Sequence, residues 1–449
     1  MKISVVGLGK LGAPLAAVLA SKGFDVVGVD LSQTAVEALN ARKAPVEEPR
    51  LQELIDSHGA RLKATTNVDE AVTATDVTFV IVPTPSDATG RFSNATVLSA
   101  MKSIGLALRR KDTYHLVVIT STVMPGSTGG EIRQALEQHS GRRVGSHLGL
   151  CYNPEFIALG SVVRDMLRPD MILIGESDKA AGDLLESIYA KSCDNTPAIR
   201  RMNFVNAELT KISVNTFVTT KISYANMLAD ICDRLPGADV DVVTQAVGTD
   251  SRIGTKYLKG ATGYGGPCFP RDNVAFAALA RAIGARAELA EATDTVNRYQ
   301  VERVLGAVEA RLTDTGLVGV LGLSYKPDTA VVEESQGLAL VERLLDLGRR
   351  VIVYDPEAIL SAQQALRRPF EVATSAAECV QRSSLVVVMT PWPEFSRIPL
   401  EAYRRSTSRL TVIDCWRATP GTVSSVADVV FLGQGAAIGA SMAGSMGIQ

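Results

Sequence analysis

The sequence is poor in the residues that build disulfide frameworks and structural metal sites. Its 449 residues include only six cysteines and four histidines. The cysteines are scattered without a C-x-x-C pair, and the histidines do not share the spacing of metal ligands. We therefore expect neither a disulfide framework nor a structural metal.

Long hydrophobic runs and an excess of one charge are also absent. No apolar run reaches the roughly 18–20 residues of a membrane span, and the N-terminus lacks the apolar core and cleavage site of a signal peptide. The 46 basic and 48 acidic residues leave a formal net charge of −2. We therefore expect a cytoplasmic protein that binds neither nucleic acid nor membrane.

Strand and helix patterns alternate at both ends of the chain and give way to helix in the middle. An apolar strand, a glycine turn, a helix and a second strand fill the first 30 residues, and similar strands follow at 77–82, 116–120 and 171–174. A segment without helix breakers at 206–235 predicts one helix of roughly 30 residues. The alternation resumes from 317 to 413, and the last 15 residues resemble a loose tail.

This alternation predicts an α/β protein with two Rossmann-like doubly wound domains joined by a central helical region. We place the domains at residues 1–204, 205–312 and 313–449.

The N-terminal turn has the pattern of a dinucleotide site. Gly7-Leu8-Gly9-Lys10-Leu11-Gly12 follows a strand and opens a helix, whose N–H groups favour phosphate. Asp30 ends the second strand, where a carboxylate accepts bonds from both ribose hydroxyls and repels a 2′-phosphate. The pattern predicts NAD as cofactor.

A second glycine-rich segment holds a cysteine beside an arginine and an aspartate: Gly263-Tyr264-Gly265-Gly266-Pro267-Cys268-Phe269-Pro270-Arg271-Asp272. Cationic surroundings favour the nucleophilic thiolate. Most single cysteines, however, are buried hydrophobic residues. The spacing alone does not decide whether Cys268 is a nucleophile or a buried hydrophobic residue.

The segment resembles the catalytic-cysteine loop of the UDP-glucose/GDP-mannose dehydrogenase family, G-F/Y-G-G-S-C-F-P-K-D, with Pro267 for Ser and Arg271 for Lys. Other family segments follow in the same order along residues 1 to about 415. They are Ala44–Pro49, Val82–Pro85, Ser121–Gly126, Asn153–Phe156, Asp250–Gly254 and Gly322–Pro327.

The resemblance implies an NAD-dependent enzyme that oxidises C6 of a nucleotide sugar through a Cys268 thiohemiacetal and thioester. UDP-glucose is our first choice of substrate, with UDP-N-acetylhexosamine and GDP-mannose as alternatives. Lys211 and Asn215, four residues apart on one helix face, match a pair that stabilises the C6 oxyanion. Glu155, Asp272 and Thr122 match residues that aid thioester hydrolysis and order water.

The same resemblance assigns binding roles and a partner. Besides the N-terminal turn and Asp30, the expected cofactor residues are Thr84, Thr122 and Arg271. The expected substrate residues are Glu155, Phe156, Lys211, Asn215, Arg252, Tyr257, Gly265 and Lys326. The family also implies a homodimer, in which Arg252 reaches the neighbouring active site.

Two departures from the family pattern leave other readings open. Leu159 stands where relatives carry a glutamate, and Glu333 replaces an arginine near the cofactor. The negative charge of Glu333 beside the pyrophosphate should weaken NAD binding unless another residue compensates for it. A nucleotide-sugar-binding protein with impaired turnover is therefore one alternative. A two-electron hydroxyacid dehydrogenase is another, although it needs neither Cys268 nor a second α/β lobe.

Overall fold

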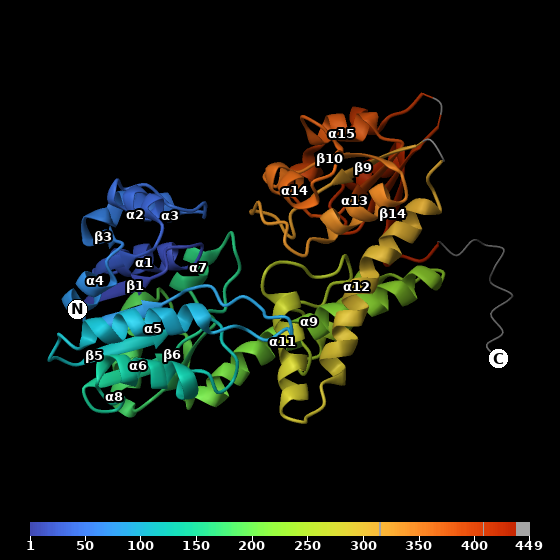
Figure 1. Ribbon diagram of the computed structural model, residues 1–449. Coiled ribbons are helices and arrows are strands. Elements are labelled where there is room, and N and C mark those ends of the chain that lie inside the picture. The colour runs from blue at the N-terminus through green and yellow to red at the C-terminus, as the bar shows by residue number, and fades with distance from the viewer. Residues whose placement is uncertain (314–315, 407, 437–449) are drawn as a thin grey trace. The chain divides into compact units, whose positions relative to one another are not determined.

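The computed structural model describes residues 1–313, 316–406 and 408–436, and it divides into two compact units, residues 1–214 and 215–449 (Figure 1). The predicted loose tail lies almost wholly outside the described residues. The long helix α9, Phe204–Arg234, runs from the first unit into the second. Each unit contains a sheet of its own.

Unit 1 is built on an eight-stranded sheet of order β3-β2-β1-β4-β5-β6-β7-β8, in which only the β6–β7 pair is antiparallel. Its strands are β1 Lys2–Val6, β2 Asp25–Val29, β3 Leu62–Thr65, β4 Val77–Val80, β5 His115–Ile119, β6 Leu148–Tyr152, β7 Met171–Glu176 and β8 Ala198–Met202. Its helices are α1 Gly12–Ser21, α2 Gln33–Asn40, α3 Leu51–His58, α4 Val68–Ala74, α5 Ala95–Leu108, α6 Arg133–Ser140, α7 Val162–Leu167 and α8 Lys179–Ser192.

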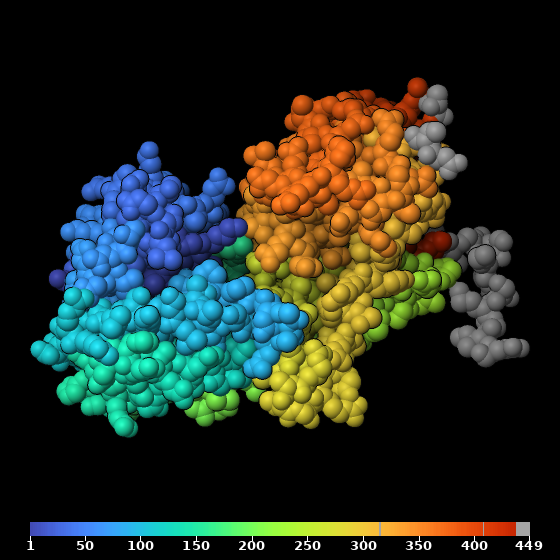
Figure 2. Space-filling model, viewed as in Figure 1, coloured from blue at the N-terminus to red at the C-terminus, as the bar shows by residue number. Residues whose placement is uncertain are grey.

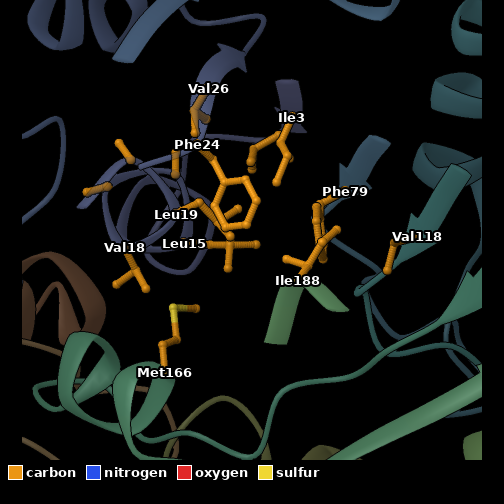
Figure 3. Packing of buried hydrophobic residues seen from close by; sticks show 14 of the residues in the cluster. Ile3, Leu15, Val18, Leu19, Phe24, Val26, Phe79, Val118, Met166 and Ile188 are labelled. Carbon is orange, nitrogen blue, oxygen red and sulfur yellow. The ribbon is translucent and has the colours of Figure 1, made fainter. Parts of the chain in front are cut away.

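Helices cover both faces of this sheet because its strands are apolar on both sides. One core cluster joins the sheet to α1, α3, α7 and α8, and includes Leu15, Phe24, Phe79 and Ile188 (Figure 3). The other joins it to α4, α5 and α6. The strand order reverses between β1 and β4, and ligands of such sheets bind at the carboxyl ends of the strands beside this point.

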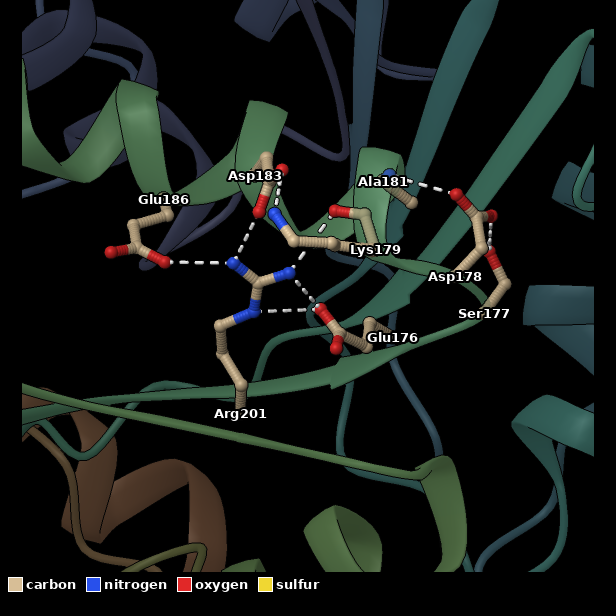
Figure 4. Close-up of polar contacts among 8 residues, drawn as sticks. All are labelled: Glu176, Ser177, Asp178, Lys179, Ala181, Asp183, Glu186 and Arg201. Carbon is tan, nitrogen blue, oxygen red and sulfur yellow. Dashed lines mark hydrogen bonds and ion pairs between the residues drawn. The ribbon is translucent and has the colours of Figure 1, made fainter.

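The edge strand β8 is fastened to its neighbours by an arginine (Figure 4). Arg201 Nε donates to Glu176 Oε2 over 2.8 Å, and its two terminal nitrogens reach Asp183, Glu186 and the carbonyl of Lys179. A Cβ on Gly182 would lie 1.6 Å from Glu176 Oε2, so a larger residue there would displace this network. Charged side chains on an edge strand also oppose pairing with another sheet.

Unit 2 combines the rest of α9 with a helical region and a six-stranded parallel sheet of order β11-β10-β9-β12-β13-β14. The helices are α10 Val240–Thr249, α11 Phe269–Ala282, α12 Glu288–Glu309, α13 Gln336–Asp346, α14 Ile359–Leu366 and α15 Ala376–Arg382. The strands are β9 Leu317–Leu321, β10 Arg350–Tyr354, β11 Glu371–Val372, β12 Leu385–Val388, β13 Leu410–Asp414 and β14 Ala427–Phe431.

Both faces of this second sheet are covered as well. One core cluster contains side chains of α12, α13 and α14, and the other contains those of α15 and of short helical turns after β12. Helices α11 and α12 pack together as a hairpin, coloured yellow in Figure 2. The side chains of Ile283, just after α11, and of Leu289, at the start of α12, are exposed. The predicted fold, two doubly wound α/β regions joined by helices with one long helix, is confirmed.

A buried polar chain crosses unit 1 and contains a histidine that is kept neutral. Thr78 Oγ1 lies 2.7 Å from Ser4 Oγ and 2.8 Å from His115 Nε2, and Lys111 Nζ lies 3.0 Å from His115 Nδ1. Burial, followed by the charge of Lys111, lowers the pKa of His115 to about 3.

This histidine should make unit 1 sensitive to acid. The unfolded chain binds a proton at His115 below its ordinary pKa of about 6.5, whereas the folded chain does not until about pH 3. Stability contributed by the neutral ring is therefore complete above pH 6.5 and falls by about 1.4 kcal/mol per pH unit below it. We expect His115→Asn to reduce this slope in denaturant titrations between pH 4 and 7, while the exposed His147→Asn leaves it unchanged. Equal slopes for all three proteins would contradict the prediction.

Candidate active site

The three glycines of the N-terminal turn have different surroundings. Gly7 has a φ of +98°, and a Cβ there would lie 2.1 Å from the Ile81 carbonyl oxygen. A Cβ on Gly12 would lie 1.8 Å from the Gly7 carbonyl oxygen. Beyond its two neighbours in the chain, a Cβ on Gly9 would have no described atom within 4 Å. Packing therefore requires glycine at 7 and 12, whereas at Gly9 it leaves open space at the N-terminus of α1.

Asp30 lies at the same turn and completes a dinucleotide cradle. Its Oδ2 accepts from Leu8 N over 2.7 Å, and its Oδ1 accepts from Ser32 N over 2.8 Å. Each carboxylate oxygen keeps acceptor capacity for a ribose hydroxyl. The open space at Gly9, the helix N-terminus and this half-buried carboxylate suit the pyrophosphate and ribose of a dinucleotide.

The matching turn of the second sheet is closed. Gly322 and Gly337 repeat the close packing of Gly7 and Gly12, since a Cβ on Gly337 would lie 2.3 Å from the Gly322 carbonyl oxygen. The carboxylate of Asp355, at the end of β10, is buried and accepts from Leu323 N, Ser324 N and Trp392 Nε1. Internal donors thus occupy the carboxylate that a ribose would need.

Five predicted site residues of unit 1 follow strands β4, β5 and β6 or lie on α9: Thr84, Thr122, Glu155, Phe156 and Lys211. Thr84 Oγ1 donates to the Thr122 carbonyl over 2.7 Å. Lys211 Nζ donates to the Glu155 carbonyl over 2.6 Å and lies 4.7 Å from the centre of the Phe156 ring. The structure therefore brings Lys211 onto the Asn153–Phe156 segment.

The carboxyl of Glu155 is held in an apolar pocket between α1 and α8. The pocket is lined by Leu15, Leu19, Phe79 and Ile188 among others, with Tyr189 as a polar neighbour. Tyr189 Oη lies 3.5 Å from Glu155 Oε1. Burial raises the pKa of Glu155 to about 7, although Lys211 and Tyr189 act in the opposite direction. A carboxyl with this pKa exchanges its proton near neutral pH, as a general base must.

In unit 2 Cys268 comes directly before α11 and is exposed, while the other five cysteines are buried or half-buried. All six lie in the described residues and are thiols without disulfides. Asp272, four residues on, is only 1% exposed, and its Oδ2 accepts from Asn215 Nδ2 over 2.6 Å. Arg271 Nε lies 3.8 Å from the other carboxylate oxygen of Asp272. A helix N-terminus stabilises negative charge nearby, which suits a thiolate at Cys268.

Three buried asparagines hold the glycine-rich loop, and sequence analysis missed all of them. Asn226 on α9 donates to the Thr262 carbonyl, and Asn297 on α12 bonds both the N–H and the carbonyl of Tyr264. Asn273 on α11 donates to the Tyr264 hydroxyl. Asparagines inside predicted helices were the available signal, because a buried amide needs partners that a helix interior does not supply.

The loop also packs against the segment after β9 that carries Lys326. Gly266 has a φ of +86° and donates its N–H to the Glu333 carbonyl over 2.9 Å. A Cβ on Gly266 would lie 2.6 Å from the Tyr325 ring, and one on Gly265 would lie 2.3 Å from the Glu334 carbonyl oxygen. The Cys268 loop and the Lys326 segment therefore form one surface of unit 2.

The remaining predicted residues of unit 2 lie before this loop. Tyr257 has a φ of +62°, and its ring is 6.4 Å from that of Phe269 in an edge-to-face arrangement. The side chain of Arg252 is 86% exposed and forms a bidentate ion pair with Asp250. Of the two family departures, Leu159 packs against the core of unit 1, and Glu333 is exposed.

Comparisons with known proteins agree over most of the chain. Residues 1–193, 205–299 and 319–420 match models of the NAD-binding, central and UDP-binding domains of the UDP-glucose/GDP-mannose dehydrogenase family. A UDP-glucose 6-dehydrogenase of Haloferax volcanii is 40% identical over 403 residues, which are 89% of this chain and 93% of that protein. A GDP-mannose 6-dehydrogenase of Pseudomonas syringae is 35% identical over 359 residues, 79% of this chain and 81% of that protein.

A solved structure extends the likeness to three dimensions. The UDP-glucose dehydrogenase of Pyrobaculum islandicum superposes with a TM-score of 0.88 at 33% identity, covering 96% of this chain and 98% of that one. In the described residues, we find no helix long and apolar enough to cross a membrane.

Proposed function

Because the chain belongs to the UDP-glucose/GDP-mannose dehydrogenase family, we propose that it oxidises the C6 alcohol of UDP-glucose to the carboxylate of UDP-glucuronate. It is an NAD-dependent oxidoreductase of nucleotide sugars. The observation that carries the proposed mechanism is Cys268, the exposed thiol at the start of α11 in a loop held by three asparagines.

NAD, when bound at the Gly7–Gly12 turn, supplies the acceptor for a hydride, and two such molecules are used in turn. Loss of the first hydride from C6 and of the hydroxyl proton to solvent leaves an aldehyde. Cys268 adds to this aldehyde and forms a thiohemiacetal, which becomes a thioester when the second hydride and the proton of its hydroxyl leave. Water then breaks the C–S bond, releasing the carboxylate and restoring the thiol. The covalent adduct keeps a reactive aldehyde on the protein.

The polar residues near these groups have separate roles in the proposal. Lys211 and Asn215 donate to the C6 oxygen while it bears negative charge. Glu155, whose pKa is raised to about 7 by burial, accepts a proton from the attacking water. Asp272 orients Asn215 through their 2.6 Å hydrogen bond, and Thr122 holds water near C6. For substrate binding we propose Phe156, Arg252, Tyr257, Gly265 and Lys326, and for the cofactor Thr84 and Arg271.

We also propose a homodimer in which a second copy of the chain covers α9. Apolar side chains that are 41–66% exposed follow one another along the part of this helix in unit 2: Phe217, Tyr224, Met227 and Ile231. Such a stripe is costly in water and suits a subunit interface. The exposed Arg252 is then available to the neighbouring active site. The division at 1–204, 205–312 and 313–449 and a cytoplasmic location stay predictions.

The substrate and the electron count are tested by one panel of nucleotide sugars. UDP-glucose should yield two NADH and one carboxylate per molecule, as measured by absorbance at 340 nm and mass spectrometry. UDP-xylose, which lacks C6, is the matched control and should yield none. Turnover confined to GDP-mannose or a UDP-N-acetylhexosamine would overturn the choice of sugar. One NADH per substrate would overturn the four-electron reaction, and tight binding without NADH would indicate a binding protein.

A further inference from the structure

Glu208 is a fully buried carboxylate in the first turns of α9, with 0% of its surface exposed. Its Oε2 accepts from Gly126 N over 2.6 Å, and its Oε1 accepts from Thr128 N over 2.7 Å. Burial raises the pKa of this carboxyl, while the hydroxyl and N–H of Thr128 and the N–H of Gly126 act against that rise. Among the described residues, no lysine or arginine contributes to the shift. The carboxylate is therefore held by neutral groups of one loop, the N–H groups of Gly126 and Thr128, with the Thr128 hydroxyl beside them.

Both amides belong to the loop that carries Thr122. This loop follows β5 and ends at the helical turn Thr128–Ile132, where the N–H of Thr128 points to the carboxylate. At the other end of the loop, the Thr122 carbonyl accepts from Thr84 Oγ1 over 2.7 Å. Gly126, between these two points, has a φ of +95°, a backbone conformation that glycine adopts more readily than other residues. Thr84 and Glu208 thus fix the loop at two points.

Glu208 lies three residues before Lys211, so the two side chains share one face of α9. Lys211 Nζ donates to the Glu155 carbonyl after β6, while Glu208 holds the loop after β5. Two charged side chains of adjacent helical turns therefore fasten α9 to the ends of two neighbouring strands. Loss of the Glu208 bonds is therefore expected to shift the Thr122 loop relative to Lys211.

We infer that Glu208 is a positioning residue of the reaction: it holds the Thr122 loop in register with Lys211 on α9. The inference rests on the proposed function, because Thr122 and Lys211 act on C6 only there. A carboxylate is needed since it presents an acceptor to both N–H groups. A glutamine of the same shape directs its own NH2 at one of them and leaves that amide without a partner.

Glu208→Gln should lower kcat for UDP-glucuronate formation at least tenfold, because misplacing a reacting group slows the chemical step. The KM values for NAD and for UDP-glucose should stay within about twofold of those of the wild-type enzyme. The matched control is Glu137→Gln on α6. Glu137 Oε1 also accepts a backbone N–H, from Val144 over 2.9 Å, and has no place in the proposed site. We expect the control to keep its kcat. A wild-type kcat for Glu208→Gln would overturn the inference, as would an equal loss in the control.

Two further measurements keep the test independent of folding yield and of substrate identity. Hydrogen exchange of the peptide 121–132 should be faster in Glu208→Gln than in the wild-type protein, and unchanged exchange would overturn the inference. The shorter Glu208→Asp should fall between the two in kcat and in exchange; wild-type values for both would overturn it. A wild-type enzyme without NADH formation from any nucleotide sugar would refute the proposed function, yet the exchange measurement would still test Glu208.

In a double-mutant cycle, Thr122→Ala and Glu208→Gln should be non-additive, because the second change acts through the first residue. The loss in kcat of the double variant should be close to that of the larger single loss. Fully multiplicative losses would show that Glu208 acts elsewhere and would overturn the inference.

Discussion

Cys268→Ala is expected to reduce UDP-glucuronate formation by at least about a thousandfold, the scale of effect seen when a covalent nucleophile is removed. Without the sulfur, the C6 aldehyde has no covalent attachment for the second hydride transfer. NAD binding should persist, because the Gly7–Gly12 turn lies in unit 1 and Cys268 in unit 2. Mass spectrometry of the product and fluorescence titration of NAD check the two outcomes separately.

Cys193→Ala is the matched control. Cys193 is half-buried at the end of α8 and is the only other cysteine that is not fully buried among the six, all of which lie in described segments. Its replacement should leave uronate formation unchanged. Iodoacetamide should modify Cys268 first, and bound UDP-glucose should protect it. Unchanged turnover in Cys268→Ala would remove the covalent mechanism while leaving the fold and family untouched.

Gly9→Ala should weaken NAD binding at least a hundredfold, or about 2.7 kcal/mol, without unfolding the protein. Beyond its two neighbours in the chain, the added methyl meets no described protein atom within 4 Å, and Gly9 is not among the residues with a positive φ. Folding therefore has no steric reason to fail. The methyl would instead take the space where the pyrophosphate approaches the N-terminus of α1. Calorimetric titration measures the affinity, and thermal unfolding measures the stability.

Gly12→Ala provides the contrast at the same turn. Its methyl would lie 1.8 Å from the Gly7 carbonyl oxygen, so this change should lower the melting temperature before it affects affinity. Gly9→Ala with normal NAD affinity would show that the pyrophosphate does not approach this turn. A loss of stability equal to that of Gly12→Ala would show that the space at Gly9 is filled in the folded protein.

The buried parallel strands were readable from the sequence because they are short apolar runs bounded by turn residues. The predicted strands at 77–82, 116–120 and 171–174 correspond to β4, β5 and β7, and the long helix predicted at 206–235 is α9. β8, Ala198–Met202, was missed because two of its five residues, Ala-Ile-Arg-Arg-Met, are charged. Only the tertiary partners Glu176, Asp183 and Glu186 make Arg201 compatible with a strand.

The candidate site was likewise predictable from the sequence only in part. Local motifs pointed to the N-terminal glycines, Asp30 and the Cys268 loop, since each depends on residues close together in the chain. The residues that hold those motifs in place were not visible, because their partners are distant in sequence. Asn226 is 36 residues from Thr262, and Glu208 is 80 residues from Thr128.

The sequence by itself determined the fold class, the family and the cofactor, because periodicity and short motifs are local properties of a chain. Tertiary structure alone decided that Gly9 faces open space while Gly12 does not, that the carboxyl of Glu155 lies in an apolar pocket, and that Glu208 binds two amides of another loop. Burial and the pairing of distant polar groups arise only when separate segments pack together, and no local pattern records them.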